Sequence, residues 1–278
     1  MRKLTVAVLG VLVSACLTQT GHAQEKRKRA SGGSQATTTN TNWNGLQTGA
    51  NGGNSSLAQN FAEPGAFLCP TYSYYAYYAP ACVETDFRFS GRPSSLTLGG
   101  FTGYRIQIGN MVIGVEGDLA WKKATTSLVQ PGITALDVKE TFTGSMTQGW
   151  DGSLRGRVGA LLTPSLLLYA TAGLAFGDVS GTFSYDAKYG SGCSAASVTG
   201  AKTWDDIRLG YTVGGGLETD VGMGLKARLE YRYTDFGRIS KDVPLTSTGC
   251  EYYSCGTNAH IDMNAAFHTV RLGLGVDL

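Results

Sequence analysis

The chain ends on the stretch HTVRLGLGVDL (His268–Leu278), in which every second residue from Val270 onward is apolar. Arg271, two glycines and Asp277 fill the positions between them. A period of two places the apolar side chains on one face of a β-strand. A strand at the end of a chain frays unless its neighbours hold it. The pattern therefore predicts a last strand that is paired on both sides, as in a closed barrel.

The composition favours a single β-rich domain that is neither disordered nor fibrous. Charged residues make up 16% of the 278 residues, below the ~25% usual for soluble domains. The chain holds 39 glycines and only 7 prolines, and no Gly-X-Y period is present. Such a composition suits strands joined by tight turns. The net charge of +2 is too small to indicate nucleic-acid binding, so no nucleic-acid partner is expected.

The first residues predict export from the cytoplasm. Two basic residues precede the apolar run Leu4–Val13, and small residues lead up to Ala23, which together indicate a signal peptide over residues 1–23. An alternative is lipidation of Cys16, which follows the sequence VSA. Residues 24–41 are polar and rich in Ser, Thr, Asn and Gly, and we expect them to form a disordered periplasmic tail.

Cysteine usage fits an oxidising compartment. Five cysteines follow the predicted signal peptide, namely Cys69, Cys82, Cys193, Cys250 and Cys255. Cys69 with Cys82 and Cys250 with Cys255 are the candidate local disulfides, and one thiol of the five is left over. No CxxC pair is present and the chain has three histidines, so we expect no zinc site and no other cofactor.

Period-two alternation recurs along the rest of the chain in units of about ten residues. Very short turns, such as Gly109–Asn110, Thr163–Pro164 and a glycine turn near Gly222, alternate with long polar connections. This wiring is typical of bacterial outer-membrane barrels. We therefore predict an all-β fold, an eight-stranded antiparallel up-and-down transmembrane β-barrel with long outer loops. It occupies residues 42–278, with a first strand at about 42–53, a long loop over 54–94 and strands two to eight within 95–278.

The distribution of charge predicts which face lies inside the barrel. In a membrane barrel the apolar face meets lipid and the charged face lines the lumen, whereas in a soluble barrel the same charges would form exposed salt bridges. Arginine dominates the charged face, and its fork suits confined carboxylates. Glycines on this face, such as Gly273, leave room for long side chains. The predicted lumen network comprises Glu116, Asp118, Asp151, Arg155, Arg157, Arg208, Glu218, Arg228, Glu230, Arg232 and Arg271, and the same face carries Arg105, Lys226 and Asp277.

Eight strands enclose an interior that side chains can just fill, so these residues predict a plugged lumen and not an open channel. Aromatic residues near strand ends would form the girdles at the two membrane interfaces. The candidates are Trp121, Trp150, Tyr104, Tyr233 and Phe236.

The stretch CPTYSYYAYYAPAC (Cys69–Cys82) is dense in tyrosine. Its side chains offer rigid, amphipathic contact area for a ligand, as in antibody loops, or they pack on one another over the barrel mouth. Both interpretations stay open at this point. The candidate contact residues are Tyr72, Tyr74, Tyr75, Tyr77 and Tyr78.

Several ordered motifs resemble a known family. They are VIGVEGDLAW (Val112–Trp121), GSLRGRVG (Gly152–Gly159), LLYATAGLAFGDV (Leu167–Val179), YTVGGGLE (Tyr211–Glu218), ARLEYRYTDFG (Ala227–Gly237) and HTVRLGL (His268–Leu274). They look like the porin-like, eight-stranded outer-membrane antigens of α-proteobacteria, the RopB family, with an OmpA-type β-barrel domain. The resemblance implies a Gram-negative outer-membrane location and roles in envelope integrity and surface exposure. Expected partners are outer-membrane lipid, lipopolysaccharide and the barrel assembly machinery.

Two other classes of function remain as alternatives. One is a small porin, or a barrel that binds host or environmental ligands through the tyrosine-rich first loop. The other is an enzyme with a Ser/His or Asp/His pair at the outer rim. His260 and His268 are the candidate histidines, but no serine motif accompanies them, so we expect no catalysis.

Overall fold

The computed structural model describes residues 42–63, 69–70, 87–91, 94–131, 138–189, 196–248, 253–254 and 258–278. The predicted signal peptide, the predicted tail and Cys16 lie outside these residues. Within them, the only regular secondary structure is the β-strand, and no helix is long and apolar enough to cross a membrane.

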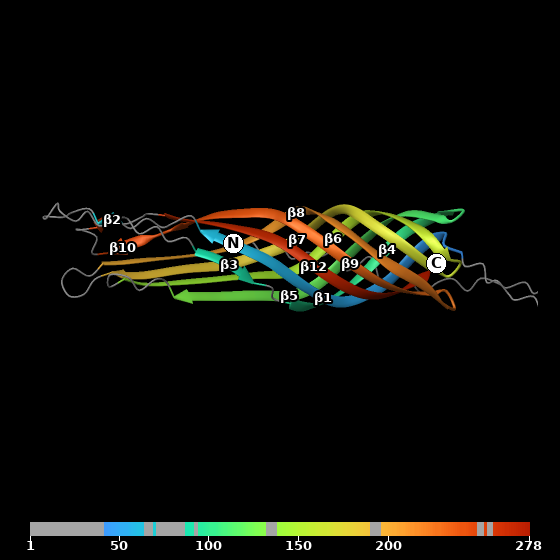
Figure 1. The fold of residues 1–278 in the computed structure, drawn as a ribbon, viewed down its shortest axis with the longest axis horizontal. Coiled ribbons are helices and arrows are strands. Elements are labelled where there is room, and N and C mark those ends of the chain that lie inside the picture. The colour runs from blue at the N-terminus through green and yellow to red at the C-terminus, as the bar shows by residue number, and fades with distance from the viewer. Residues whose placement is uncertain are drawn as a thin grey trace, which may run out of the picture. The chain divides into compact units, whose positions relative to one another are not determined.

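Eight long antiparallel strands wind around one axis and close into a ring (Figure 1). Neighbours along the chain pair with one another, β12 pairs with β1, and β8 pairs with β9. The predicted eight-stranded up-and-down barrel is therefore confirmed. The long strands are β1 (Gly45–Glu63), β4 (Ser94–Ile108), β5 (Met111–Pro131), β6 (Val138–Thr163), β7 (Leu166–Tyr189), β8 (Ala196–Gly222), β9 (Leu225–Pro244) and β12 (Asn258–Asp277).

The last strand is held on both sides. From Val270 to Val276, β12 pairs with β9 on one side and with β1 on the other. Its C-terminal end lies at the end of the barrel with the short turns, which are Gly109–Asn110, Pro164–Ser165 and Met223–Gly224. Gly222 and Gly224 have φ values of +91° and +76°, a region in which glycine meets no steric penalty.

The strands extend further than the sequence pattern predicted. The first strand is Gly45–Glu63 and not 42–53, so part of the expected loop over 54–94 is strand, and β3 (Phe87–Gly91) pairs with it. One of the predicted long polar connections, which follows Trp121, is also largely strand, because β5 continues to Pro131 and β6 begins at Val138. At the outer end the barrel therefore continues as a β-sheet beyond the length that a bilayer requires, about 9–11 residues per strand.

The two zones of the barrel have opposite polarity. In the zone toward the short turns, the apolar side chains face outward and stay exposed, as Leu174 (66%) and Leu272 (66%) do, while the charged side chains are buried in the lumen. In the outer zone the interior is apolar, with Phe142, Phe183 and Ile239 buried. We call the first zone the lipid band and the second the outer extension. The predicted inward position of the charges thus applies to the lipid band.

The change of zone on β6 coincides with a β-bulge. The register of β6 against β7 shifts between Gln148 and Asp151. The inward-facing residues of β6 are therefore odd-numbered on the short-turn side of the bulge and even-numbered on the outer side. An extra residue in one strand shifts the alternation of its side chains by one position. Trp150 lies at the bulge and packs edge-to-face on Phe176, with ring centroids 6.2 Å apart.

Four of the five predicted girdle residues lie on the outer face, but Phe236 does not. Trp121 is 50% exposed, Tyr104 is also exposed, and Tyr233 contacts His268 with ring centroids 5.1 Å apart. Phe236 is buried against Phe267 inside the outer extension. The prediction for Phe236 was wrong because it assumed a lipid-facing position at a strand end, whereas β9 continues beyond it.

The first and last long connections meet at the outer end. Here β2 (Cys69–Pro70) pairs with β11 (Tyr253–Ser254), and β10 (Thr246–Thr248) pairs with β8. Cys69 lies opposite Ser254 in this register. The other cysteines of the predicted disulfides, Cys82, Cys250 and Cys255, lie outside the described residues, as do Tyr72, Tyr74, Tyr75, Tyr77 and Tyr78. The local disulfides and the tyrosine contact surface stay predictions.

Candidate functional site

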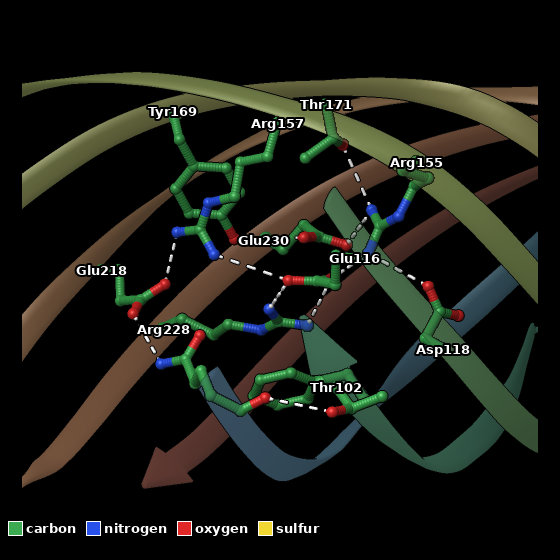
Figure 2. A network of polar contacts seen from close by, with 12 residues as sticks. Thr102, Glu116, Asp118, Arg155, Arg157, Tyr169, Thr171, Glu218, Arg228 and Glu230 are labelled. Carbon is green, nitrogen blue, oxygen red and sulfur yellow. Dashed lines mark hydrogen bonds and ion pairs between the residues drawn. The ribbon is translucent and has the colours of Figure 1, made fainter. Parts of the chain in front are cut away.

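The lumen of the lipid band holds a network of buried ion pairs (Figure 2). Glu116 on β5 is at its centre and accepts hydrogen bonds from arginines on two other strands. Arg155 Nη2 on β6 lies 2.5 Å from Glu116 Oε1, and Arg228 Nη1 on β9 lies 2.7 Å from Glu116 Oε2. Arg157 Nη1, also on β6, lies 3.5 Å from the same Oε2. One carboxylate thus connects three guanidinium groups.

Asp118, two residues further along β5, is the second centre. Its Oδ2 is 2.6 Å from Arg232 Nη2 and 3.0 Å from Arg155 Nη2, and its Oδ1 is 3.3 Å from Arg271 Nη1. Ser153 donates a further hydrogen bond to Oδ2 at 2.6 Å. Every side-chain oxygen of this carboxylate therefore has a donor, as a buried charge requires.

The third centre is Glu218 on β8, nearer the short turns. It pairs with Arg157, with Arg105 Nη1 at 2.6 Å and with Gln47 Nε2 at 2.8 Å. Arg105 also bonds Asp277 at 2.5 Å, which links the network to the last strand.

Glu230 and two aromatic rings complete the packing. Glu230 on β9 accepts from Arg155 at 2.9 Å and from the Tyr169 hydroxyl at 3.1 Å. The Arg157 guanidinium carbon is 3.7 Å from the centre of the Tyr169 ring, a stacking that Figure 2 shows. The Arg228 guanidinium carbon lies 3.5 Å from the centre of the Phe101 ring. Arginine tolerates such sites because its planar cation both stacks and pairs.

One glycine makes room for this packing. A Cβ atom on Gly273 would lie 3.0 Å from Arg228 Cγ, so a larger residue would displace that arginine. The lumen beside Gly273 is packed so closely that one added methyl group would require a neighbouring side chain to shift.

The predicted residues Asp151 and Arg271 lie at the outer edge of the network, and Arg208 does not join it. Asp151 Oδ2 is 3.6 Å from Lys122 Nζ and 3.8 Å from Arg271 Nη2. Arg208 lies higher on β8, where its side chain is 28% exposed and its carboxylate partner is Asp206 at 3.3 Å. The alternation placed Arg208 on the correct face but could not give its height along the strand.

Trp43 lies at the short-turn end of the lumen. Its side chain is fully buried, and its indole N–H donates to the carbonyl of Pro164 in the β6–β7 turn at 3.2 Å. Lys226 Nζ and the Arg105 guanidinium lie 4.5 Å and 5.4 Å from the ring centre. The segment before β1 therefore places an aromatic ring under the charge network, with cations against it.

An apolar cluster fills the lumen on the other side of the network. Its members come from β1, β6, β7, β8, β9 and β12, and all are buried. Phe142 and Phe183 pack edge-to-face at 4.0 Å between ring centroids. The cluster consists of Leu57, Phe142, Met146, Ala175, Val179, Phe183, Tyr185, Val198, Trp204, Phe236, Ile239, Val243, Ile261, Met263, Ala265 and Phe267.

Sequence reasoning missed Lys122, Trp43 and this cluster. Lys122 continues the inward series of Glu116 and Asp118 at a spacing of two, so the alternation could have found it. The cluster was hidden because its strands carry Ser, Thr and Gly between the apolar residues and resemble polar loops. Trp43 precedes β1 and follows no alternation, so no sequence signal places its ring in the lumen.

The two candidate histidines lie on the outer face and are not adjacent. His268 Nδ1 is 2.7 Å from the Tyr231 hydroxyl. His260 in the outer extension is bonded to Asp242 at 2.7 Å and lies 3.5 Å from Asp262. The hydrogen bond to Asp242 raises the pKa of His260 above its usual value. Ser240 donates to Asp262 and not to His260, which is not the order of a nucleophilic triad.

Comparison with known proteins agrees with this architecture. A family model described as "Outer membrane protein beta-barrel domain" matches residues 9–277. The 22 kDa outer membrane protein of Rhizobium leguminosarum bv. viciae is 38% identical over 176 residues, 63% of this chain and 63% of the relative. The alignment thus spans less than two thirds of that relative's length.

Two further relatives come from Brucella. The 31 kDa outer-membrane immunogenic protein of Brucella melitensis biotype 1 is 32% identical over 64% of this chain and 67% of its own length. The 25 kDa outer-membrane immunogenic protein of Brucella abortus biovar 1 is 33% identical over 56% of this chain and 59% of its own length. The predicted resemblance to outer-membrane antigens of α-proteobacteria is confirmed. The chain is a Gram-negative outer-membrane protein that belongs to the outer membrane protein β-barrel domain family.

Proposed function

We propose that this protein is a sealed structural barrel of the outer membrane and not a channel. The observation that carries the proposal is that three ion pairs join strands on opposite sides of the ring. Counting around the ring, β5 and β9 are four strands apart, and so are β4 and β8. The three pairs are Glu116–Arg228, Asp118–Arg232 and Arg105–Glu218.

Ion pairs that cross the full width of an eight-stranded barrel leave little room for a continuous column of water, because such an interior is barely wide enough for side chains. The apolar cluster on one side and Trp43 on the other add two further barriers. The buried amide atoms of Asn51 and Gln148 have no hydrogen-bond partner among the described residues. Buried amide groups without partners are positions well suited to hold isolated water molecules.

A solute-flux assay tests the seal. Proteoliposomes with the refolded protein should swell in an isotonic solution of a small sugar no faster than protein-free liposomes, while a known open porin gives rapid swelling. Swelling at a rate that scales with protein content would favour the alternative function, a small porin.

A sealed barrel would support the integrity of the envelope as an assembled, surface-exposed protein of the outer membrane. The relatives are named as outer-membrane or immunogenic proteins and not as enzymes, which supports a non-catalytic role. Cells without the gene should become more sensitive to detergents and large antibiotics. A copy with an intact network should restore resistance, whereas unchanged sensitivity in the deletion strain would refute this role.

A further inference from the structure

The outer faces of β6, β7 and β8 carry an array of hydroxyl groups above Trp150. In the register of these strands, Thr147 lies beside Ser180, Ser145 beside Thr182, and Thr182 beside Thr203. Two rows further out, Thr141 and Thr199 flank Asp186. We call this surface the hydroxyl face, and it consists of Thr141, Thr143, Ser145, Thr147, Ser180, Thr182, Ser184, Thr199 and Thr203.

Neighbouring hydroxyls on this face are within reach of one another. Thr182 and Thr203 are 3.3 Å apart, and Thr147 is 3.3 Å from Thr125 on β5. Threonine suits exposed strands for conformational reasons alone, but serine does not share that preference. Exposed strands usually also carry Lys and Glu, and between the rows of Asp205 and Asp186 the described outer positions of these three strands carry neither.

The hydroxyl face is continuous with the lipid-facing surface. The same strands expose Leu154, Leu174 and Leu209 below it, and Trp150 and Phe176 mark the boundary. At about 3.3 Å per residue and a tilt near 40°, the face above this boundary spans roughly 15 Å along the barrel axis from Thr147 to Thr141. A lipid whose acyl chains contact the band therefore has its head group beside the hydroxyl face.

We propose that the hydroxyl face binds the core oligosaccharide of the lipopolysaccharide that surrounds the barrel. Each Ser or Thr hydroxyl can both donate and accept hydrogen bonds. It can therefore pair with the hydroxyls that project from all sides of a sugar ring, which do the same. A phosphate would require arginine or lysine, and the rows of the hydroxyl face carry neither; the exposed Lys188 lies one row further out, beyond Asp186. Asp178 and Asp205 at its lower edge also disfavour phosphate.

The test uses the refolded protein in phosphatidylethanolamine vesicles with lipopolysaccharide that has either a complete or a truncated core. The complete core should raise the unfolding temperature above the truncated form by about 2–4 °C, which corresponds to ~1 kcal/mol for a domain of this size. The triple variant Thr143→Val, Thr182→Val, Thr203→Val keeps β-branched side chains of the same shape and should lose this difference. The variant Thr48→Val, Thr102→Val, in the lipid band, is the matched control and should keep it.

The alternative outcomes are distinguishable. A triple variant that responds to the complete core as the parent does would overturn the proposal. An equal rise with a soluble, unanchored polysaccharide would overturn the assignment to the surrounding leaflet, and a rise that depends on protein concentration would indicate a second copy of the chain. Equal heat-modifiable migration of all variants shows that they fold, and a leaky parent barrel would refute the seal without affecting this result.

Discussion

Arg228 on β9 reaches across the lumen to Glu116 on β5, on the opposite wall of the ring, with Nη1 2.7 Å from Oε2. The two residues are 112 positions apart in the chain. Their strands share no backbone pairing, so the contact forms only when the ring has closed. The pair thus joins opposite walls of the barrel across the lumen.

Removal of one partner should therefore destabilise the barrel. Arg228→Ala leaves Glu116 with fewer cations in a confined site, and breaking a dry buried pair costs ~3–5 kcal/mol. A small lumen is wetter than a protein core, so we expect about 1–3 kcal/mol, measured as a shift in urea-induced unfolding. Arg238→Ala, whose side chain is 69% exposed beside Asp262, is the control. Equal stabilities of the two variants would contradict a structural role for the network.

Trp43→Ala should open the short-turn end of the lumen and lower stability. The variant removes a fully buried ring and its contacts with Arg105 and Lys226, and such truncations typically cost about 3–5 kcal/mol. Leu46→Ala, which changes a side chain 43% exposed on the outer face, should cost much less. Thermal unfolding in detergent compares the two, and equal midpoints would show that Trp43 is not a closing element.

A charge on the lipid-facing surface should block assembly, whereas the same charge on the outer extension should not. Leu272 and Asn264 both lie on the outer face of β12, but only Leu272 belongs to the lipid band. Arginine near the bilayer midplane costs ~2–4 kcal/mol. Leu272→Arg should reduce heat-modifiable protein in the membrane, and Asn264→Arg should assemble like the parent. Comparable loss in both variants would mean that the zones are wrongly placed.

The ring of His260 should titrate above the ordinary pKa of 6.5. Because the folded pKa is raised, the stabilisation from the hydrogen bond with Asp242 is complete below pH 6.5 and disappears as the pH rises through the folded value. NMR titration of the ring measures this directly. Asp242→Asn should lower the pKa, while Asp186→Asn on β7 should leave it unchanged. A pKa at or below 6.5 in the parent would refute the hydrogen bond.

How much the sequence predicts depends on which zone a residue occupies. The exposed position of Leu272 and the buried positions of Arg155 and Arg232 follow from alternation alone, since a strand fixes which face each residue occupies. Alternation carries no information on the position of a residue along the barrel axis. Arg208 was therefore assigned to the network, although it lies nearer the outer end than the network does. Phe142 and Thr143 lie in the part of β6 beyond the bulge, where the apolar side chains face inward. The sequence pattern of this part does not differ from that of a polar loop. The position of Trp43 depends on tertiary contacts with a turn 121 residues away.

Single-channel recording in a planar lipid bilayer tests the central claim most directly. With the Glu116–Arg228 pair and its neighbours intact, the parent protein should give no steady current, and Arg157→Ala or Arg228→Ala should at most allow small, brief openings. Large, steady, diffusion-like conductance of the parent would show that water and ions pass the network, and the account of a sealed barrel would be wrong.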